Sequence, residues 1–261
     1  RDLTLARRQA GDRVRVRPLF ADLLRAVSAV DGIRRVRYTS PHPKDLRPET
    51  IAAMAEVPEV CEHLHLPLQA GSDRVLAAMH RGYTAGRYLD RLAAARAAMP
   101  DLAVTTDIIV GFPGETDDDF ERTLAVVAEA GYDSAYTFIY SPRPGTEAAA
   151  RVDDFVPAEV SAERFERLRV VVERSALARH RARLGEVEDV LVEGPSRRDP
   201  TMTTGRSEHN KLVHFPAPDP LRAGTYARVR VTEAAPHHLK GDLLEVVAPA
   251  RHRTRIPVAS A

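Results

Sequence analysis

Two hydrophobic patterns alternate along the chain up to residue 184. Apolar residues recur at helical spacing over 19–30 and stop at Asp31-Gly32, a signal for the end of a helix. Further helices are predicted at 48–57, from 73 onward, at 84–99, at 116–130 and at 161–184. Runs rich in β-branched residues predict strands at 33–39, 62–68, 102–110 and 134–140. Strands that alternate with helices predict parallel β/α units, in part of a barrel or in an open sheet.

The pattern changes after Gly185. Five short β-like runs follow without helical periodicity between them: "EVEDVLVEG", "TMTTGRS", "KLVHF", "GTYARVRVTEA" and "LLEVVAP". They predict a small all-β barrel of the general kind that binds oligonucleotides on its face. We therefore expect three parts, which are a β/α domain at 1–184, the small barrel at 185–249 and a flexible tail at 250–261.

The composition narrows the class of protein. A chain of 261 residues with 44% hydrophobic content can bury a core, and no apolar stretch reaches the roughly 20 residues of a membrane span. We expect a soluble, monomeric protein of the cytoplasm that has no membrane partner. The single cysteine, Cys61, excludes disulfides within the chain, and no cluster held by several thiolates can be built from it. The net charge of +1 gives no strong signal for nucleic acid.

Four loops that combine proline or glycine with polar residues follow the predicted strands. They are SPHP at 40–43, PLQAGS at 67–72, GFPGE at 111–115 and SPRPGT at 141–146. In parallel β/α folds a ligand binds beyond the carboxyl ends of the strands, so these loops mark the candidate site. The third loop leads into a helix start with the spacing of a capping box, Thr116-x-x-Asp119. Its four carboxylates suit a helix N-terminus but would repel a phosphate: Glu115, Asp117, Asp118 and Asp119.

Two histidines and the cysteine lie near the second predicted strand. His63 and His65 alternate and so face the same side of that strand, as the metal pair of a barrel hydrolase does. Because no histidine lies between His80 and His180 to complete such a site, we expect His65 to line the interior of the barrel. Cys61 is expected to be a partly buried structural thiol.

Three stretches carry a resemblance to a known family: "HLHLPLQAGSDRVLAAMHRGYTAGRY", "TDIIVGFPGETDDDFERTL" and "FIYSPRPGTEAA". With the "GRSEHNKLVHF" of the small barrel, they make the chain similar to the methylthiotransferase family of radical S-adenosylmethionine enzymes from Pro18 to about Val247. The SPRPGT loop and the barrel motif resemble its tRNA-modifying branch. The resemblance implies a partial radical SAM (β/α) barrel, TIM-barrel-like, followed by a small OB-like TRAM barrel.

The resemblance also assigns residues to the cofactor S-adenosylmethionine, a sulfonium cation without phosphate, so the acidic helix start carries no penalty. Ile109 would contact the adenine, Gly111 would allow close backbone approach, and backbone groups of Tyr140 and Ser141 would bind the edge of the base. The ribose or the methionyl end would be bound by Gln69 and Ser72.

The partner implied by the resemblance is the anticodon stem-loop of a tRNA. Arg206, Asn210 and Lys211 of the small barrel resemble RNA-contacting positions, and neither Arg206 nor Lys211 is expected in the core. Arg143 would contact a carboxylate or an RNA phosphate. The implied reaction adds a methylthio group to C2 of N6-isopentenyladenosine at position 37 of the tRNA.

The chain departs from the family in its cysteines. The family uses two [4Fe-4S] clusters, one held by Cys-x3-Cys-x2-Cys and one by three further cysteines, and none of these six is present. We therefore expect the C-terminal part of a longer enzyme, which would also need a reductant protein, and we assign no catalytic or metal-binding residue to this chain. Two alternatives stay open: the family's sister enzyme, which modifies an aspartate of ribosomal protein S12, and a non-catalytic RNA-binding remnant.

Overall fold

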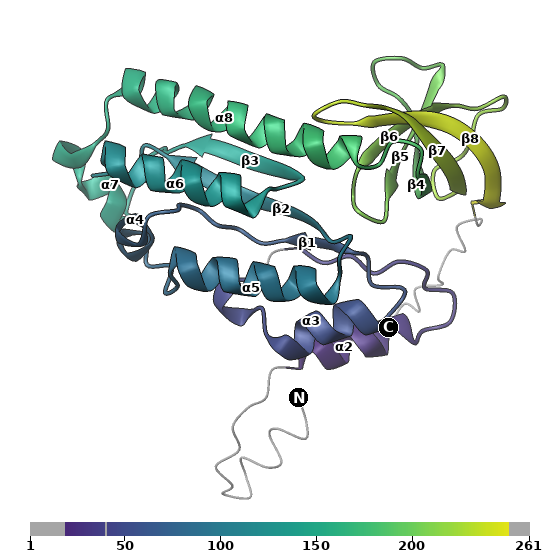
Figure 1. The fold of residues 1–261 in the computed structure, drawn as a ribbon, viewed down its shortest axis with the longest axis horizontal. Coiled ribbons are helices and arrows are strands. Elements are labelled where there is room, and N and C mark those ends of the chain that lie inside the picture. The colour runs from purple at the N-terminus through teal and green to yellow at the C-terminus, as the bar shows by residue number, and fades with distance from the viewer. Residues whose placement is uncertain (1–18, 40, 251–261) are drawn as a thin grey trace, which may run out of the picture.

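The computed structural model describes residues 19–39 and 41–250. Within them, helices cover one face of a three-stranded parallel sheet, and a closed β-barrel follows at the end of a long helix (Figure 1). No helix in these ranges is long and apolar enough to cross a membrane. The predicted tail lies outside the described residues from position 251 onward.

The β/α part has the predicted alternation of helices and strands, except that the run at 33–39 forms no strand and a short helix at Glu147–Ala150 was not predicted. Its helices are α2 (Phe20–Ser28), α3 (Pro48–Glu56), α4 (Asp73–Ala78), α5 (Ala85–Ala98), α6 (Asp117–Ala130), α7 (Glu147–Ala150) and α8 (Ala158–Arg181). Two short 3-10 turns lie at Pro43–Asp45 and Val152–Asp154. The strands β1 (His63–His65), β2 (Ala103–Val110) and β3 (Ser134–Ile139) pair in parallel in the order β1-β2-β3. The described sheet is open, as predicted for a partial barrel.

Two predicted strands are shorter than expected. The run at 33–39 forms one parallel bridge, between Val36 and Val60, while its arginines donate hydrogen bonds to carbonyls of the small barrel. The run at 62–68 is a strand only to His65, because Pro67 has no N–H to give to a ladder. The carbonyls beyond that point accept hydrogen bonds from the hydroxyl groups of Tyr83 and Tyr88.

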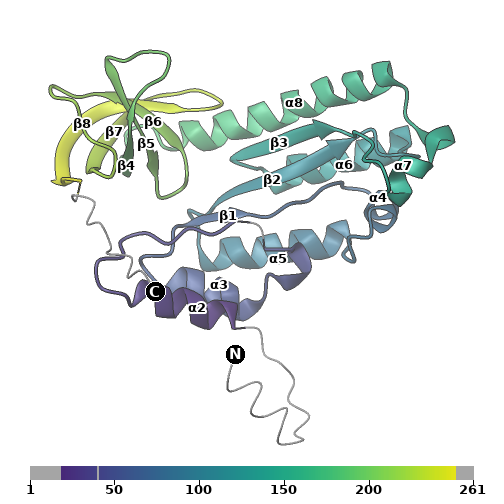
Figure 2. The same ribbon diagram turned by 180° about the vertical axis from the view of Figure 1, so that it is seen from behind.

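The core of the β/α part lies between the sheet and the helices. Tyr88 and Tyr132 are completely buried there, and their hydroxyl groups are 2.9 Å apart in a hydrogen bond. The helices cover one face of the sheet, and α6 lies behind β2 and β3 in Figure 2, which views the other face. Along β3, Ala135 packs into the core while Tyr136 and Phe138 lie on that other, uncovered face.

The small barrel is formed by the five runs that the sequence predicted. Its strands are β4 (Val187–Pro195), β5 (Met202–Ser207), β6 (Leu212–Pro216), β7 (Tyr226–Ala234) and β8 (Leu239–Ala248). They close in the order β4-β5-β6-β8-β7 around a core that includes Val190, Val213 and Phe215. Two glycines permit close strand approach, since a Cβ on Gly205 or on Gly241 would lie 2.5 or 2.2 Å from a backbone oxygen.

Polar contacts hold the small barrel against the β/α part. The Arg35 guanidinium donates to the carbonyl oxygens of Arg206 at 2.9 Å and of Asp189 at 2.6 Å. His180, near the end of α8, contacts the carbonyl oxygen of Ala235 at 2.5 Å. These contacts fix the position of the barrel relative to the β/α part.

Candidate cofactor cavity and nucleic-acid interface

A cavity of about 580 Å³ opens at the carboxyl ends of the strands. This volume is in the range of small-molecule sites, about 300–1,000 Å³. Its walls come from the ends of β1, β2 and β3, from α4 and its end, and from the loop and helix around α7: Gln69, Ala78, Met79, His80, Arg81, Asp107, Ile109, Phe112, Phe138, Ile139, Tyr140, Ser141, Arg143, Thr146, Glu147, Ala148 and Arg151. The structure thus brings Gln69, Ile109, Tyr140, Ser141 and Arg143, all named from the sequence, to one cavity.

Gln69 is held in the cavity wall by backbone pairing. Its N–H donates to the Asp107 carbonyl at 2.8 Å, and its carbonyl accepts from the Ile109 N–H at 2.9 Å. Its φ of 69° lies in the left-handed region, which is uncommon for glutamine and recurs at functional sites. Its side-chain amide makes no hydrogen bond to any described residue. The amide is therefore available to a ligand.

Ile109 and Tyr140 supply the apolar side of the cavity. Ile109 pairs in register with Phe138, and both line the cavity. The Tyr140 ring contacts Phe112 and Phe155 edge-on, with centroid distances of 5.3 and 6.0 Å. Its N–H donates to the Val110 carbonyl at 2.8 Å, while its buried hydroxyl has no hydrogen-bond partner among the described residues. The wall can accept a flat apolar ring.

Ser72 and Gly111 do not line the cavity. Ser72 occupies the N-cap position of α4, but its hydroxyl donates to Asp119 at 2.5 Å instead of capping the helix. Gly111 has a φ of 72°, and a Cβ added there would lie 2.4 Å from the Ser161 hydroxyl oxygen of α8. Glycine is needed at 111 for the turn and for the packing of α8.

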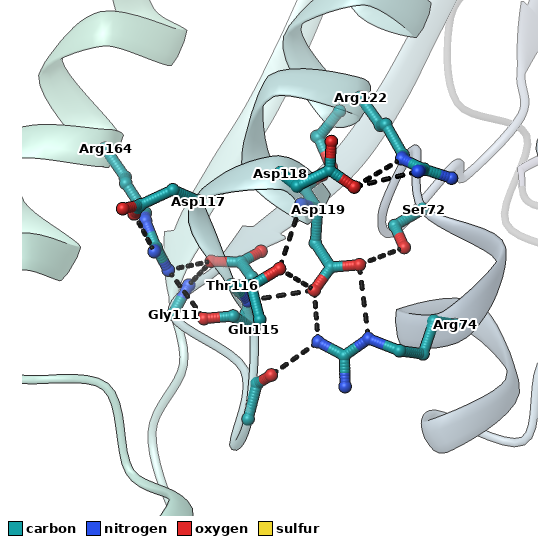
Figure 3. Close-up of polar contacts among 12 residues, drawn as sticks. Ser72, Arg74, Gly111, Glu115, Thr116, Asp117, Asp118, Asp119, Arg122 and Arg164 are labelled. Atoms are coloured by element: carbon teal, nitrogen blue, oxygen red, sulfur yellow. Dashed lines mark hydrogen bonds and ion pairs between the residues drawn. The ribbon is translucent and has the colours of Figure 1, made fainter.

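The four carboxylates of the acidic helix start bind arginines of the same chain (Figure 3). The buried Glu115 pairs with Arg164 at 2.9 Å, and Asp117 contacts the same guanidinium at 2.6 Å. Asp118 pairs with Arg122 at 2.8 Å. Burial raises the pKa of the Glu115 carboxyl, and the Gly111 N–H and Arg164 oppose that rise. The four carboxylates are thus paired within the chain, and Glu115 and Asp119 are buried while Asp117 and Asp118 stay largely exposed.

Asp119 completes the capping box that the sequence predicted. Its carboxylate accepts from the Thr116 N–H at 2.9 Å, and its own N–H donates to the Thr116 hydroxyl. It also pairs with Arg74 and accepts from Ser72. Burial opposes ionisation of Asp119, but hydrogen bonds from Arg74, Ser72 and Thr116 outweigh it and lower the pKa of the carboxyl. Arg74 lies 45 positions away along the chain, so local spacing could not reveal it.

Histidines and Thr105 form a polar row on the uncovered face of the sheet. His65 contacts the Thr105 hydroxyl at 2.9 Å and Asp107 at 3.4 Å, and His63 contacts the same hydroxyl at 3.2 Å. Both histidines therefore face one side, as predicted. Burial, together with Arg37, lowers the pKa of His63 to about 3, so this ring is neutral at pH 7.

The small barrel carries a groove of about 970 Å³ rich in cationic and imidazole groups. They are Arg197, Arg198, Arg206, His214, His237, His238 and Lys240, against two carboxylates, Glu193 and Asp199. Arg206 pairs with Glu193 at 3.4 Å and donates to the Asn210 carbonyl at 3.1 Å. Burial lowers the pKa of both His214 and His238. Only Arg206 of this groove was recognised from the sequence, because its other cations are far apart along the chain.

Lys211 is buried, contrary to the expectation that it lies outside the core. Its side chain is 4% exposed and pairs at 2.5 Å with Asp133, whose side chain is 8% exposed and lies at the start of β3. Asn210 has a φ of 60° and forms the turn before β6. Of the three barrel residues singled out from the sequence, Arg206 lines the basic groove and Lys211 joins the barrel to the β/α part.

Comparison with known proteins defines the class. Residues 8–127 match the Radical SAM superfamily, and residues 181–244 match the TRAM domain. The chain therefore carries a Radical SAM region, within its β/α part, and a TRAM domain, which forms its closed barrel.

The relatives are more specific. Proteins of Burkholderia cenocepacia (strain HI2424) and Burkholderia vietnamiensis (strain G4 / LMG 22486) are each named tRNA-2-methylthio-N(6)-dimethylallyladenosine synthase. Each is 47% identical over 230 residues, which cover 87% of this chain and 50% of the relative. The chain thus spans about half the length of the curated relatives it matches. Coproporphyrinogen III oxidase (HemN) from Escherichia coli is a solved neighbour at 15% identity, with a TM-score of 0.44 over 72% of this chain and 44% of that one.

The described residues fit one part of the family's cofactor set and not the other. The cavity offers an apolar wall and a free amide, which suit the adenosyl group of S-adenosylmethionine. An iron–sulfur cluster needs several thiolates, and Cys61 is the only cysteine of the sequence. Burial raises the pKa of its thiol, which therefore stays protonated at neutral pH. No group of three or more histidine, cysteine or acidic residues in the described ranges could hold a metal ion.

Proposed function

We propose that the chain is the cofactor-binding and RNA-binding part of a tRNA methylthiotransferase. The observation that carries the proposal is a cavity suited to an adenosyl group on one part of the molecule and a basic groove on the barrel fixed to it. The names of the relatives favour tRNA over a ribosomal protein as the substrate. The proposed reaction adds a methylthio group to C2 of N6-isopentenyladenosine at position 37 of the tRNA.

In this proposal the cavity binds the adenosyl part of S-adenosylmethionine. Ile109 packs against the adenine, and the Tyr140–Ser141 backbone binds the edge of the base. The free amide of Gln69 hydrogen-bonds the ribose or the methionyl end. Ser72 and Gly111 act indirectly, Ser72 by holding Asp119 and Gly111 by allowing the turn and the approach of α8.

The proposed RNA contacts lie on the barrel groove and at the rim of the cavity. Arg206 and the cations around it bind phosphates of the anticodon stem-loop, and Asn210 shapes the adjacent turn. Arg143, exposed at the cavity rim, binds a phosphate near the modified base. The buried ion pair of Lys211 with Asp133 holds the barrel, and with it this surface, against the β/α part.

In this proposal, the iron–sulfur clusters are held by residues that lie outside this chain. S-adenosylmethionine bound to a reduced [4Fe-4S] cluster supplies the radical that breaks an unactivated C–H bond in such enzymes. This chain contributes binding, orientation and exclusion of water, and the thiolates must come from outside it. Accordingly, iron–sulfur reconstitution of the chain alone should yield no 5'-deoxyadenosine, and formation of this product above background would contradict the assignment.

Equilibrium dialysis with radiolabelled S-adenosylmethionine tests the cavity. Gln69→Asn keeps a side chain that tolerates positive φ but withdraws the amide by one methylene, so it should weaken binding about tenfold, the loss of about one hydrogen bond, ~1.4 kcal/mol. Ile109→Ala should weaken binding as well because it removes the apolar wall. Arg122→Ala, on the exposed face of α6, is the matched control and should bind as the wild type does.

Equal affinity of the two cavity variants and the control would contradict the cavity assignment. If the chain binds the anticodon stem-loop but no S-adenosylmethionine, the second candidate, a non-catalytic RNA-binding protein, replaces the first. The observation that favours this second candidate is the single, buried cysteine.

A further inference from the structure

The basic groove of the barrel is linked to the cofactor cavity by a smaller groove and by strand β3. The basic groove of the barrel shares Arg206, Leu212 and His237 with a smaller groove of about 110 Å³ between barrel and sheet. That smaller groove reaches Tyr136 in the first half of β3. Phe138, two positions further along the same strand, already lines the cofactor cavity. Strand β3 therefore connects the basic groove to the cavity.

Tyr136 and Phe138 form an exposed aromatic pair on this strand. Their exposed fractions are 59% and 52%, although large aromatic rings are usually well covered. They share one face of β3, and pairing with Asp107 and Ile109 places them on the side of the sheet that no described helix covers (Figure 2). The described ring contact of Tyr136 is an edge-on approach to His65 at 6.0 Å. Both rings can accept a flat group.

Cations outnumber carboxylates at both ends of the pair. At the barrel end, Arg206 and Lys240 line the groove, and at the other end Arg81, Arg143 and Arg151 line the cavity. Asp107, which pairs in register with Tyr136, is partly exposed and lies 3.4 Å from His65. Aromatic rings between cationic surfaces are typical of sites for single-stranded nucleic acid, where bases stack and phosphates pair. An apolar protein segment would use the rings but not the flanking cations.

We propose that a single-stranded segment of RNA runs along β3 from the basic groove to the cofactor cavity, with bases stacked on Tyr136 and Phe138. The proposal rests on the proposed function and adds the route that the RNA takes. The two rings are two residues apart, about 6.6 Å along a strand. The six residues of β3 span about 20 Å.

Fluorescence on a synthetic anticodon stem-loop tests this route. One end label reports affinity by anisotropy, and 2-aminopurine in the loop, whose emission falls when it stacks, reports ring contact. Tyr136→Leu and Phe138→Leu keep apolar area but remove the ring. Each should raise Kd about tenfold, ~1.4 kcal/mol, and abolish the quenching at one 2-aminopurine position. Tyr136→Phe keeps the ring and should retain both signals.

Val170→Ala is the matched control, since Val170 is 58% exposed on α8 and away from β3. Circular dichroism establishes that each variant is folded. If the wild type binds the stem-loop and the leucine variants bind it equally, with unchanged quenching, the route along β3 is wrong while the proposed function stands. If the folded wild type does not bind the stem-loop at low salt, the RNA-binding function fails, and the route fails with it.

Discussion

The ion pair between Lys211 and Asp133 offers a sharp test of how the two parts of the molecule are joined. Both side chains are almost fully buried and lie 2.5 Å apart. Lys211→Met keeps the length and apolar stem of the side chain but leaves the Asp133 carboxylate buried without its cation. Removing one partner of a buried pair costs about 3–5 kcal/mol. The other carboxylate oxygen still accepts from the Val104 N–H at 2.8 Å, so we expect the lower end of that range.

The assay is urea denaturation followed by circular dichroism. A loss of ~3 kcal/mol lowers the midpoint by about 1–3 M urea if the slope is about 1–3 kcal/mol per M. Asp133→Asn should cost a similar amount, because it leaves the ammonium group unpaired. The double variant should cost at least ~1 kcal/mol less than the sum of the single variants, because it leaves neither charge alone.

Arg206→Ala is the control for this experiment, because its exposed pair with Glu193 at 3.4 Å should contribute at most ~1 kcal/mol. A Lys211→Met protein whose free energy of unfolding lies within ~0.5 kcal/mol of the wild type would refute the reasoning. So would single-variant costs that add fully in the double variant, since the two groups would then not interact.

Three further predictions concern the turn at Gly111, the buried carboxylate of Glu188 and the basic groove of the barrel. Gly111→Ala should lower the free energy of unfolding by about 1–3 kcal/mol, because its φ is 72° and the added Cβ would meet Ser161. Thermal or urea unfolding measures this loss. Adding Ser161→Gly to the same chain should restore only the part of the loss that comes from the clash with Ser161. Burial opposes ionisation of Glu188, but contacts with His209 and Arg183 outweigh burial and lower the pKa of this carboxyl from 4.5 to about 2. The stability that the ionised carboxylate contributes is present above pH 4.5 and should be lost as the pH falls toward 2. Glu188→Gln should flatten that part of the stability–pH curve, and an unchanged slope would contradict the assignment. Arg206→Ala should reduce the slope of log affinity for the stem-loop against log salt by about one unit or less, with no change if Arg206 is only a solvated turn charge.

The sequence by itself determined the elements that depend on neighbouring residues. The capping box of Thr116 and Asp119 is confirmed, and it could be predicted because both of its hydrogen bonds join residues three positions apart. Helix α6 ends at Gly131, which has a left-handed backbone conformation. The five barrel strands coincide with the five β-like runs. The strand ends were recognisable from Gly and Pro, and this was enough to bring Gln69, Ile109 and Tyr140 to one cavity, because parallel strands present their carboxyl ends at one edge.

Only the tertiary structure decided what each polar side chain near the site faces. Ser72 and Asp119 are 47 positions apart, and Lys211 and Asp133 are 78 apart, so no local spacing could pair them. Gly111 has the turn conformation that its sequence context suggests, but its open side faces Ser161 of α8 and not the cavity. Burial and hydrogen bonding depend on which distant segments pack together. The hydrophobic periodicity of a segment can be read from its own sequence. The partner of a buried charge depends on how the whole chain folds.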